Sequence, residues 1–282
     1  MGSRCYCMIL NYNDSETVIK LVNDIKNFLI FDQIVIVDNC SNDNSMKNLL
    51  KIKNPIIDII QTDVNGGYGY GNNYGIKYIQ KKYGDGYILI SNPDVIFTEE
   101  MVGNLLQEFY FDNNVAVSTA VQLDINRKQI KDIAWKVPNS LECAILNSGK
   151  FSKFSQINYK FDDKTKKAYV DCVPGALLMI DSNKFLSVDG YDEEMFLYCE
   201  ETTLGYKLKQ KKYKTVLLLN DNYIHEHSVS INKSIPKKKK QLEILYQSRN
   251  LFMKKYLRSH PIYILLAKYF QNRSLKYLDN KY

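Results

Sequence analysis

Five groups of polar residues in this chain have types and positions suited to ligand binding or catalysis. The first is Asn92-Pro93-Asp94, which follows the apolar run 87–91. Proline cannot donate to a sheet ladder, so strand pairing should stop at Pro93 and leave the carboxylate of Asp94 facing a ligand. Open α/β folds bind ligands where strands end. An ordinary Asn-Pro-Asp turn is the alternative.

A second carboxylate, Asp38, has a similar position. It follows the apolar run 34–37 and precedes the polar segment 39–44. If both apolar runs are parallel strands, Asp38 and Asp94 lie at the same edge of the sheet. A helix cap or an Asx-turn is the alternative for Asp38.

Segment 65–75 is rich in glycine and asparagine and opens a helical pattern. Its backbone could therefore approach a phosphate or a ribose closely. It is not a dinucleotide fingerprint, because Asn72 occupies the last glycine position, and it is not a P-loop, because no Gly-Lys-Ser/Thr follows. A flexible turn is the alternative, but the composition favours a constrained backbone site.

Two later segments carry further ionisable groups. Glu200 and Glu201 stand at a predicted helix start, where the helix dipole alone could explain them, but one of them could act as a general base. His225 opens the segment 225–230, His-Glu-His-Ser-Val-Ser. Its histidines could ligate a metal or donate to a phosphate, and Ser228 and Ser230 could bind phosphate oxygens. A structural role is the alternative for the histidines.

The elements that must position these groups alternate between strand and helix patterns, as in a mostly parallel sheet covered by helices. Strands are expected at 5–10, 33–37, 56–61, 87–91, 115–121 and 215–219. Helices are expected at about 15–29, 45–50, 72–83, 99–111 and 195–211. Regular structure is also expected at 170–180, whereas 126–168 should be irregular or form short helices, including a mobile loop near a substrate.

Composition suggests a setting and a class of partner. The six cysteines form no C-x-x-C pair and no zinc spacing, and the first residues show no signal-peptide pattern, so a reduced cytoplasmic setting is expected. The formal net charge of +7 suits an anionic partner. After residue 232, Pro236 and Lys237–Lys240 precede a basic helical tail, 233–282, which could lie on an anionic membrane surface or pack on its own domain.

The motifs follow a recognisable order: Leu10-Asn-Tyr-Asn13, Val37-Asp-Asn39 with Ser41 and Asp43, Asn65-Gly-Gly, Gly71-Asn-Asn73, Asn92-Pro-Asp94, Gly175-Ala, Gly190-Tyr-Asp-Glu193, Glu200-Glu201 and 225–230. In this order they resemble family 2 glycosyltransferases, and most closely the bacterial rhamnosyltransferase-like branch that builds surface polysaccharides. The resemblance covers about residues 4–232, and the joint occurrence is far more specific than any single motif.

The resemblance implies an α/β GT-A fold over residues 1–232, with a nucleotide-binding half to about residue 125 and an acceptor-binding half at 126–232. It implies an inverting transferase that uses Mn²⁺ or Mg²⁺ and moves a sugar from a UDP-sugar or dTDP-rhamnose to a growing surface glycan. The acceptor would be lipid-linked, and the tail could then touch the membrane. Nucleic acid is not an expected partner, and the oligomeric state is open, with a homodimer possible.

Site residues follow by position from the same resemblance. Asp38 would contact the nucleotide base, Asp94 would hold the metal on the diphosphate, and His225 would lie near that metal and diphosphate. Glu201 matches the presumed base, with Glu200 as the alternative. The nucleotide-sugar would be lined by Asn11, Asn65, Gly66, Gly67, Gly71, Asn72, Asn73 and Asn92.

The chain departs from the family pattern at three positions. Asn92 replaces the first acid of the family's D-x-D motif, Thr203 stands where a further Asp is common, and Lys207 replaces a frequent Arg that a lysine cannot match in bidentate contacts. Two other classes are possible: a sugar nucleotidyltransferase, whose N-terminal Gly-rich motif with Arg and Lys is absent, and a basic membrane- or nucleic-acid-binding module, against which the acidic strand ends argue.

Overall fold

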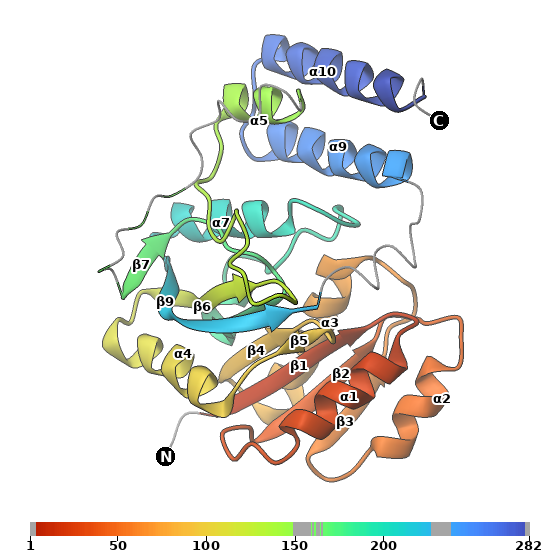
Figure 1. Cartoon of the computed structure of the whole chain (residues 1–282), viewed down its shortest axis with the longest axis vertical. Helices are drawn as coiled ribbons and strands as arrows, with labels where there is room; N and C mark the ends of the chain where they lie inside the picture. Colours follow the sequence, from red (N-terminus) through yellow and green to blue (C-terminus); the bar gives the residue numbers. More distant parts are fainter. Residues whose placement is uncertain are drawn as a thin grey trace.

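The computed structural model describes residues 4–148, 159, 161, 164, 166–226 and 238–279. A nine-stranded sheet with helices on both faces forms its centre (Figure 1). The strand order is β3-β2-β1-β4-β8-β6-β9-β5, and β7 pairs with β9 beside this path.

The first half of the sheet is parallel, as the alternating pattern predicts. It consists of β1 (Cys5–Asn11), β2 (Gln33–Asp38), β3 (Ile57–Gln61) and β4 (Tyr87–Ser91). The connecting helices are α1 (Ser15–Ile25), α2 (Ser45–Leu49) with the short 3-10 helix η1 (Leu50–Ile52), and α3 (Tyr68–Tyr83). Parallel neighbours need such crossovers, and these place the carboxyl ends of the strands at one edge.

The second half is mixed and contains one further parallel pair, so parallel pairing is continuous only across β3-β2-β1-β4. Here β8 (Leu177–Asp181) runs antiparallel to both β4 and β6 (Val115–Leu123). The long β9 (Lys214–His225) is parallel to β6 but antiparallel to β5 (Val95–Ile96) and β7 (Lys167–Val170). Antiparallel pairing needs no helical crossover, so short returning strands such as β5 can join the sheet directly.

Each face of the sheet has its own hydrophobic core, because successive strand residues point to opposite faces. On β1, Cys5, Cys7 and Ile9 face the core covered by α1 and α4 (Glu99–Phe111), whereas Tyr6 and Met8 face the core covered by α3 and α7 (Glu200–Gln210). Burial raises the pKa of the Cys7 thiol. All six cysteines are free, and four of them are buried, which agrees with a packing role.

Three helix boundaries differ from the sequence prediction, and one of them is the start of α7, which lies at Glu200 rather than at about residue 195. Helix α1 ends at Ile25 rather than near residue 29, because the chain turns away and leaves Leu29 94% exposed. Helix α3 begins at Tyr68 rather than Asn72, so much of the glycine-rich segment is helix and not loop. Its glycines bring the helix close to the sheet: a Cβ on Gly75 would lie 2.5 Å from Val37 Cγ2.

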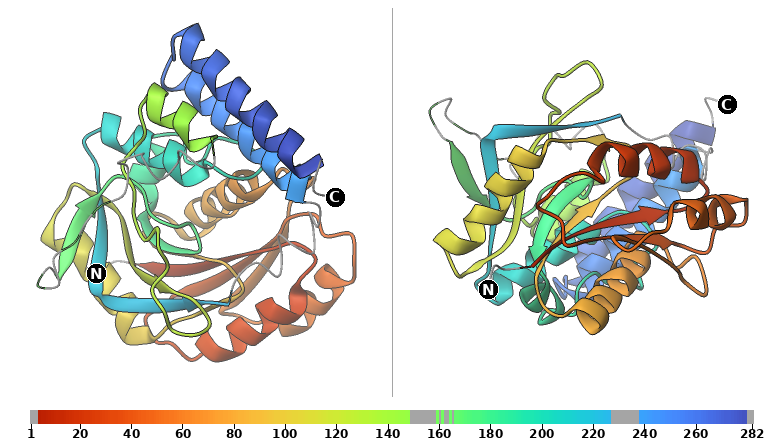
Figure 2. Two further views of the ribbon diagram at one scale, coloured as in Figure 1. Left: turned by 45° about the horizontal axis from the view of Figure 1, so that its top comes forward. Right: turned by 90° about the horizontal axis from the view of Figure 1, so that it is seen from below.

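The C-terminal tail is helical, as expected, and packs on the rest of the chain. Helices α9 (Lys238–Lys255) and α10 (Pro261–Asp279) lie against α5 (Ser140–Leu146) at one end of the molecule (Figures 1 and 2). A small core joins them, with Phe252, Met253 and Ala267 against Cys143 and Met195. The remaining helix, α6 (Ser182–Leu186), follows β8. In the part of the chain described, no helix has the length and apolar character needed to cross a bilayer.

We predict that Gly67→Ala destabilises the fold and Gly103→Ala does not. Gly67 has φ +91°, and a Cβ there would overlap the backbone of Phe196, so the free energy of unfolding should fall by about 2–4 kcal/mol. Gly103 lies within α4 with its nearest neighbour 3.9 Å from an added Cβ, and alanine there should add about 0.5–1 kcal/mol. Urea denaturation measures both, and equal stability of the two variants would contradict the predicted close contact.

Candidate functional site

The predicted strand-end residues meet at one edge of the sheet. Asn11 at the end of β1 lies opposite Asp38 at the end of β2, and Ser91 at the end of β4 lies opposite Ile9 of β1. The chain then passes through Asn92-Pro93 to Asp94. The expectation that the two carboxylates share an edge is therefore confirmed.

Asp38 is fully buried, and its carboxylate accepts four hydrogen bonds. Oδ1 accepts from the side chains of Asn11 and Ser41, both at 2.6 Å, and Oδ2 accepts from the Ser41 backbone N–H at 3.0 Å and from Gln61 Nε2 at 2.8 Å. These donors compensate the charge for its loss of water. A carboxylate has about four acceptor positions, so a nucleotide base could bond to Asp38 only by replacing a partner, and exposed Gln61 is the most accessible.

Hydrogen bonds of the Asn39 and Asn65 side-chain amides fix the start of the glycine-rich segment. Asn39 Nδ2 donates to Asn65 Oδ1 and to the Gly67 carbonyl, both at 3.0 Å, and the Gly67 N–H donates to Asn65 Oδ1 at 3.1 Å. The next residue, Tyr68, donates its backbone N–H to the Phe196 carbonyl at 3.1 Å. These bonds join the end of β2, the start of α3 and the segment before α7. Gly66 lies at the partly exposed surface of this junction.

Three further residues predicted to line the nucleotide-sugar are buried in α3. A Cβ on Gly71 would lie 2.5 Å from Leu10 Cδ1, so this glycine serves close packing. Asn72 donates to the Tyr68 carbonyl at 2.9 Å, and its buried Oδ1 has no partner among the described residues. Asn73 donates to the carbonyl of Tyr191 and accepts from its N–H, both at 2.9 Å. Their contact with a nucleotide-sugar stays a prediction.

Asp94 and His225 meet because β5 pairs with β9. Val95 lies opposite His225, and the Glu226 N–H donates to the Asp94 carbonyl at 2.8 Å. The side chains of Asp94 and His225 are 6% and 12% exposed, and Oδ1 of Asp94 lies 3.1 Å from Nε2 of His225. The sequence prediction thus paired two residues 131 positions apart.

Gln122 fixes the ring of His225 from the other side. Gln122 Nε2 lies 3.0 Å from His225 Nδ1, and the Tyr223 hydroxyl donates to Gln122 Oε1 at 3.0 Å. For Nε2 to bind a cation, Nδ1 must carry the proton, and the Gln122 amide must then turn its oxygen to accept from Nδ1. No motif marks Gln122, although a glutamine at the end of a strand with few polar residues is a signal of a buried polar contact.

The pair Asp94 and His225 fits a divalent cation that takes most of its ligands from elsewhere. Two ligands at right angles with bonds of about 2.0–2.2 Å have donor atoms about 3 Å apart, which agrees with the 3.1 Å between Oδ1 and Nε2. No group of three His, Cys, Asp or Glu side chains that could hold a metal occurs among the described residues. Phosphate oxygens and water would have to complete the coordination, as is usual for Mg²⁺.

Glu200 and Glu201 open α7 as predicted, after a strained stretch of backbone. Tyr198 and Cys199 have φ of 70° and 66°, in the left-handed region that non-glycine residues rarely adopt. Such strain persists only when the surroundings enforce it, and it clusters at functional sites. Here α9 contributes, because the Ser248 hydroxyl donates to the Leu197 carbonyl at 2.8 Å.

The two glutamates differ in environment. Glu200 is 2% exposed, and its Oε1 has no partner within the described part of the chain. Burial and the nearby charge of Glu201 raise the pKa of Glu200 well above its usual range. Burial also raises the pKa of Glu201, but backbone N–H groups, including that of Gly175, oppose this rise by donating to its carboxylate. The pKa of Glu200 is therefore raised by two causes, whereas Glu201 is partly exposed and has backbone donors that favour its ionised form.

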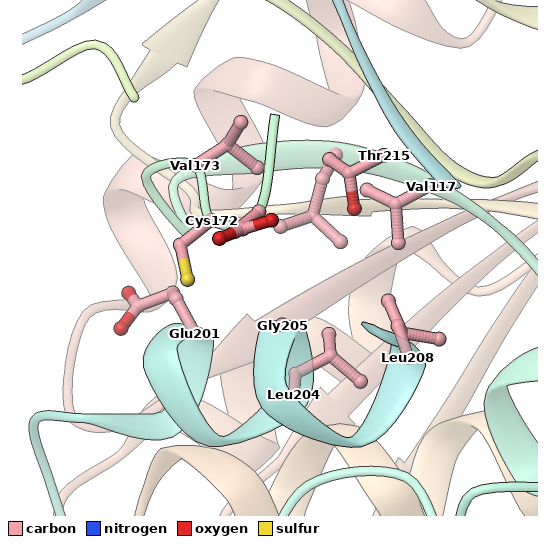
Figure 3. Close-up of a pocket in the computed structure, with 10 residues that line it drawn as sticks. Val117, Cys172, Val173, Glu201, Leu204, Gly205, Leu208 and Thr215 are labelled. Carbon is pink, nitrogen blue, oxygen red and sulfur yellow. The ribbon is translucent and has the colours of Figure 1, made fainter. Parts of the chain in front are cut away.

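Gly175 lies against Glu201, and an added Cβ would be 2.7 Å from Glu201 Oε1. Figure 3 shows Glu201 in the first turn of α7, with its carboxylate directed away from Leu204 and Leu208. Glu201 and Asp171 line one part of a small pocket, and those leucines, with Val117, Val173 and Leu178, line its apolar part. Its walls are mainly apolar, so we interpret it as a packing gap rather than a ligand site.

Two tyrosines that the sequence analysis did not assign border the glutamates. The Tyr68 hydroxyl donates to the Gly175 carbonyl at 2.7 Å, and its ring meets Tyr191 edge to face at 5.6 Å between centroids. Burial raises the pKa of both hydroxyls, and the charge of Glu201 adds to the rise. The hydroxyl of Tyr191 is buried beside that of Tyr68. Both tyrosines lie in segments that the sequence marks, 65–75 and 190–193, but the motifs give them no role.

The loop before α7 is held by lysines. Lys207 of α7 donates to the carbonyls of Asp189 and Gly190, and burial lowers its pKa to about 8. Lys255 of α9 pairs with Asp192 at 2.9 Å, and the Tyr256 hydroxyl donates to the same carboxylate at 2.7 Å. Burial alone would raise the pKa of Asp192, but these hydrogen bonds outweigh it and lower that pKa.

These contacts give the departures from the family pattern a structural role. Lys207 holds a loop, as described above, and the buried hydroxyl of Thr203 contacts Met195 Sδ at 3.3 Å. Asn92 lies two residues before Asp94, and its backbone N–H donates to the Ala176 carbonyl at 2.8 Å. Of the remaining candidates, His227, Ser228, Ser230 and Lys237 lie outside the described residues.

One series of contacts joins the groups into a single site. Asn92 bonds to Ala176, the neighbouring Gly175 contacts Glu201 and accepts from Tyr68, and Tyr68 follows the amide-held glycine segment. The site therefore combines a strand-end carboxylate and imidazole, a constrained backbone segment and a partly exposed ionisable glutamate. Such a set can hold a metal-bound anion and remove a proton from a nearby hydroxyl.

Comparison with solved structures shows a GT-A fold, as expected. The structure of GalNAc-T7 with UDP, GalNAc and Mn²⁺ aligns with a TM-score of 0.63 and 13% identity, over 89% of this chain and 50% of that chain. The mannosyltransferase PcManGT from Pyrobaculum calidifontis, in complex with GDP-Man and Mn²⁺, aligns with a TM-score of 0.61 and 10% identity, over 96% of this chain and 70% of that chain.

The chain belongs to glycosyl transferase family 2, whose model matches residues 6–175. It is 24% identical over 212 residues to the rhamnosyltransferase WbbL of Escherichia coli (strain K12), covering 72% of this chain and 76% of the relative. It is also 24% identical over 204 residues to the low-salt glycan biosynthesis hexosyltransferase Agl10 of Haloferax volcanii, covering 72% of this chain but only 61% of that relative.

We predict that Gly175→Ala lowers sugar transfer with little loss of stability. The new methyl group would displace the Glu201 carboxylate, which ends a flexible side chain and can move, so kcat should fall about tenfold or more. Gly103→Ala is the matched control and should keep full activity. Steady-state kinetics and thermal unfolding of both variants make the test, and an unchanged kcat for Gly175→Ala would show that the position of Glu201 does not matter.

Proposed function

We propose that this chain is a metal-dependent inverting glycosyltransferase. It moves a sugar from a UDP-sugar or dTDP-rhamnose to a hydroxyl of a growing, lipid-linked surface polysaccharide. One observation carries the proposal: Glu201 contacts Gly175, and the next residue, Ala176, accepts a hydrogen bond from Asn92. These two contacts connect the proposed base to the strand end that holds Asp94 and His225. Residues 1–125 would bind the nucleotide, and residues 126–232 the acceptor.

Asp94 and His225 would hold Mn²⁺ or Mg²⁺ on the diphosphate of the donor. The bound metal neutralises negative charge that grows on the nucleoside diphosphate as it leaves. Because Asn92 replaces an acid, the protein supplies little charge of its own to the cation. Metal alone should therefore bind weakly, and metal and nucleotide should bind together.

Glu201 would act as the general base. It would take the proton of an acceptor hydroxyl while that oxygen bonds to the anomeric carbon, and the carbon–oxygen bond to the diphosphate would break on the opposite face. Inversion follows from this geometry, and a base of this kind contributes about 10² to 10⁴ in rate. A protonated Glu200 beside it keeps a second negative charge out of the buried site.

The nucleotide would lie along the edge formed by Asn11, Asp38 and segment 65–67. Exposed Gln61 would give up its bond to Asp38 for a base contact, or make that contact itself. Donors of this class and lipid-linked acceptors meet at the cytoplasmic face of a cell membrane, where we place the reaction. The match to family 2 and the strand-end acids argue against the nucleotidyltransferase and the non-enzymatic alternatives.

Asp94→Ala should abolish metal-dependent nucleotide binding. Isothermal titration of UDP and of dTDP, each with and without Mn²⁺, should show a loss of about tenfold or more for this variant, because its only acidic metal ligand is gone. Asp24→Ala, at an exposed position of α1, is the control and should titrate like wild type. An unchanged Mn²⁺-dependent titration of Asp94→Ala would remove Asp94 from the metal site.

Glu201→Gln should lower kcat by about 10² to 10⁴, whereas Glu200→Gln, which imitates a carboxyl that is already protonated, should lower it far less. The base must be ionised, and burial raises its pKa. The wild-type rate should therefore be low at acid pH and rise with pH through a pKa above that of free glutamate. Equal losses in both variants, or near wild-type transfer by Glu201→Gln, would contradict the assignment of the base.

A further inference from the structure

The outward face of α10 exposes an unusual number of large apolar side chains. Ile262, Leu265, Tyr269 and Tyr277 are 62%, 66%, 59% and 65% exposed. Their spacing places the first three on one stripe of the helix, with Tyr277 at its margin. Figures 1 and 2 show α10 at the outer end of the molecule, beyond α9 and α7.

The internal packing of the chain does not require this stripe. Helix α10 already buries Ala267 and Gln271 on its inner side, and Tyr263, Ile264 and Leu266 pack on the core shared with α5 and α9. The helix thus has two apolar faces, one buried and one open. An open apolar face of this kind indicates an interaction surface.

Basic side chains surround the open face. Lys268, Arg273 and Lys276 are exposed on the same side of α10, and residues 261–278 contain no acidic residue. The start of α9 lies near the end of α10 and adds exposed Lys238–Lys240, of which Lys240 is 3.7 Å from Glu243. The exposed face of α10 and the start of α9 therefore combine aliphatic, tyrosine and basic side chains.

We propose that the outward face of α10 docks on an anionic lipid bilayer. Its aliphatic side chains would enter the headgroup boundary, its tyrosines would lie at the interface, and its lysines and arginine would reach lipid phosphates. A second copy of the chain is a poorer occupant. In a two-fold contact the same face would meet itself and bring the basic residues of both copies together, with one acidic residue, Asp279, in each helix.

The proposed function places the reaction at a membrane, and this proposal names the helix that binds there. It rests on the proposed function only for the reason why the chain would bind a membrane. The helix that opens with Glu200 and Glu201 lies on the same side of the sheet as α9 and α10 (Figure 1). A bilayer on α10 would therefore face the acceptor half, which suits an acceptor anchored in that bilayer.

Vesicle co-sedimentation of the full chain tests the proposal. Wild type should bind vesicles of phosphatidylcholine with phosphatidylglycerol, and bind pure phosphatidylcholine and high-salt samples weakly. Each basic group at such a surface contributes about fivefold, so K268Q/R273Q/K276Q should weaken binding by roughly 100-fold. The control K51Q/K81Q/K128Q removes the same charge from exposed positions elsewhere and should bind like wild type.

A second variant separates lipid insertion from charge alone. Ile262→Gln with Leu265→Gln should weaken vesicle binding without changing thermal unfolding, since both side chains are exposed. Equal loss in the two charge triples, or no binding by wild type, would overturn the proposal. So would a concentration-dependent dimer in light scattering that Ile262→Gln with Leu265→Gln dissolves, because a second copy would then occupy the face. UDP titration with Mn²⁺ on the same samples reports the nucleotide site separately.

Discussion

The backbone hydrogen bond between Tyr68 and Phe196 is the constraint on which the site depends. It forms only because Gly67, with its positive φ and no side chain, lets the start of α3 touch the segment before α7. The bond joins the start of α3, next to the strand ends of the parallel half-sheet, to the segment before α7. Helix α9 holds that segment in place through Ser248. Together with the Asn92–Ala176 bond and the Gly175–Glu201 contact, the Tyr68–Phe196 bond fixes the glutamates of α7 relative to the strand ends.

The two buried acids Asp38 and Glu200 differ in how many hydrogen-bond donors surround them. Asp38 is tolerated at full burial because four donors meet its carboxylate, whereas Glu200 has a buried oxygen without a partner among the described residues and a raised pKa. The donors around Asp38 fix its carboxylate in one orientation, whereas burial and the charge of Glu201 raise the pKa of Glu200. This difference in environment, rather than in residue type, divides the roles of the acids.

The sequence predicted the parallel half of the sheet well, because periodicity and turn residues are local signals. It also brought Asp94 and His225 together, but only through a family resemblance. What local patterns could not show was the pairing of β5 with β9, the helical nature of Gly69 to Gly75, and the roles of Tyr68, Tyr191 and Gln122. These depend on tertiary contacts, in which a glycine that looks like a loop residue lets a helix approach a strand.

The central claim is that a metal-diphosphate site at Asp94 lies beside a base at Glu201. A crystal structure with UDP and Mn²⁺, with the metal located by anomalous scattering, tests it most directly. The account predicts Mn²⁺ about 2.0–2.2 Å from Asp94 and from diphosphate oxygens, with the Glu201 carboxylate facing the cavity next to the diphosphate. Mn²⁺ bound away from Asp94, or a Glu201 screened from the diphosphate by protein, would contradict it.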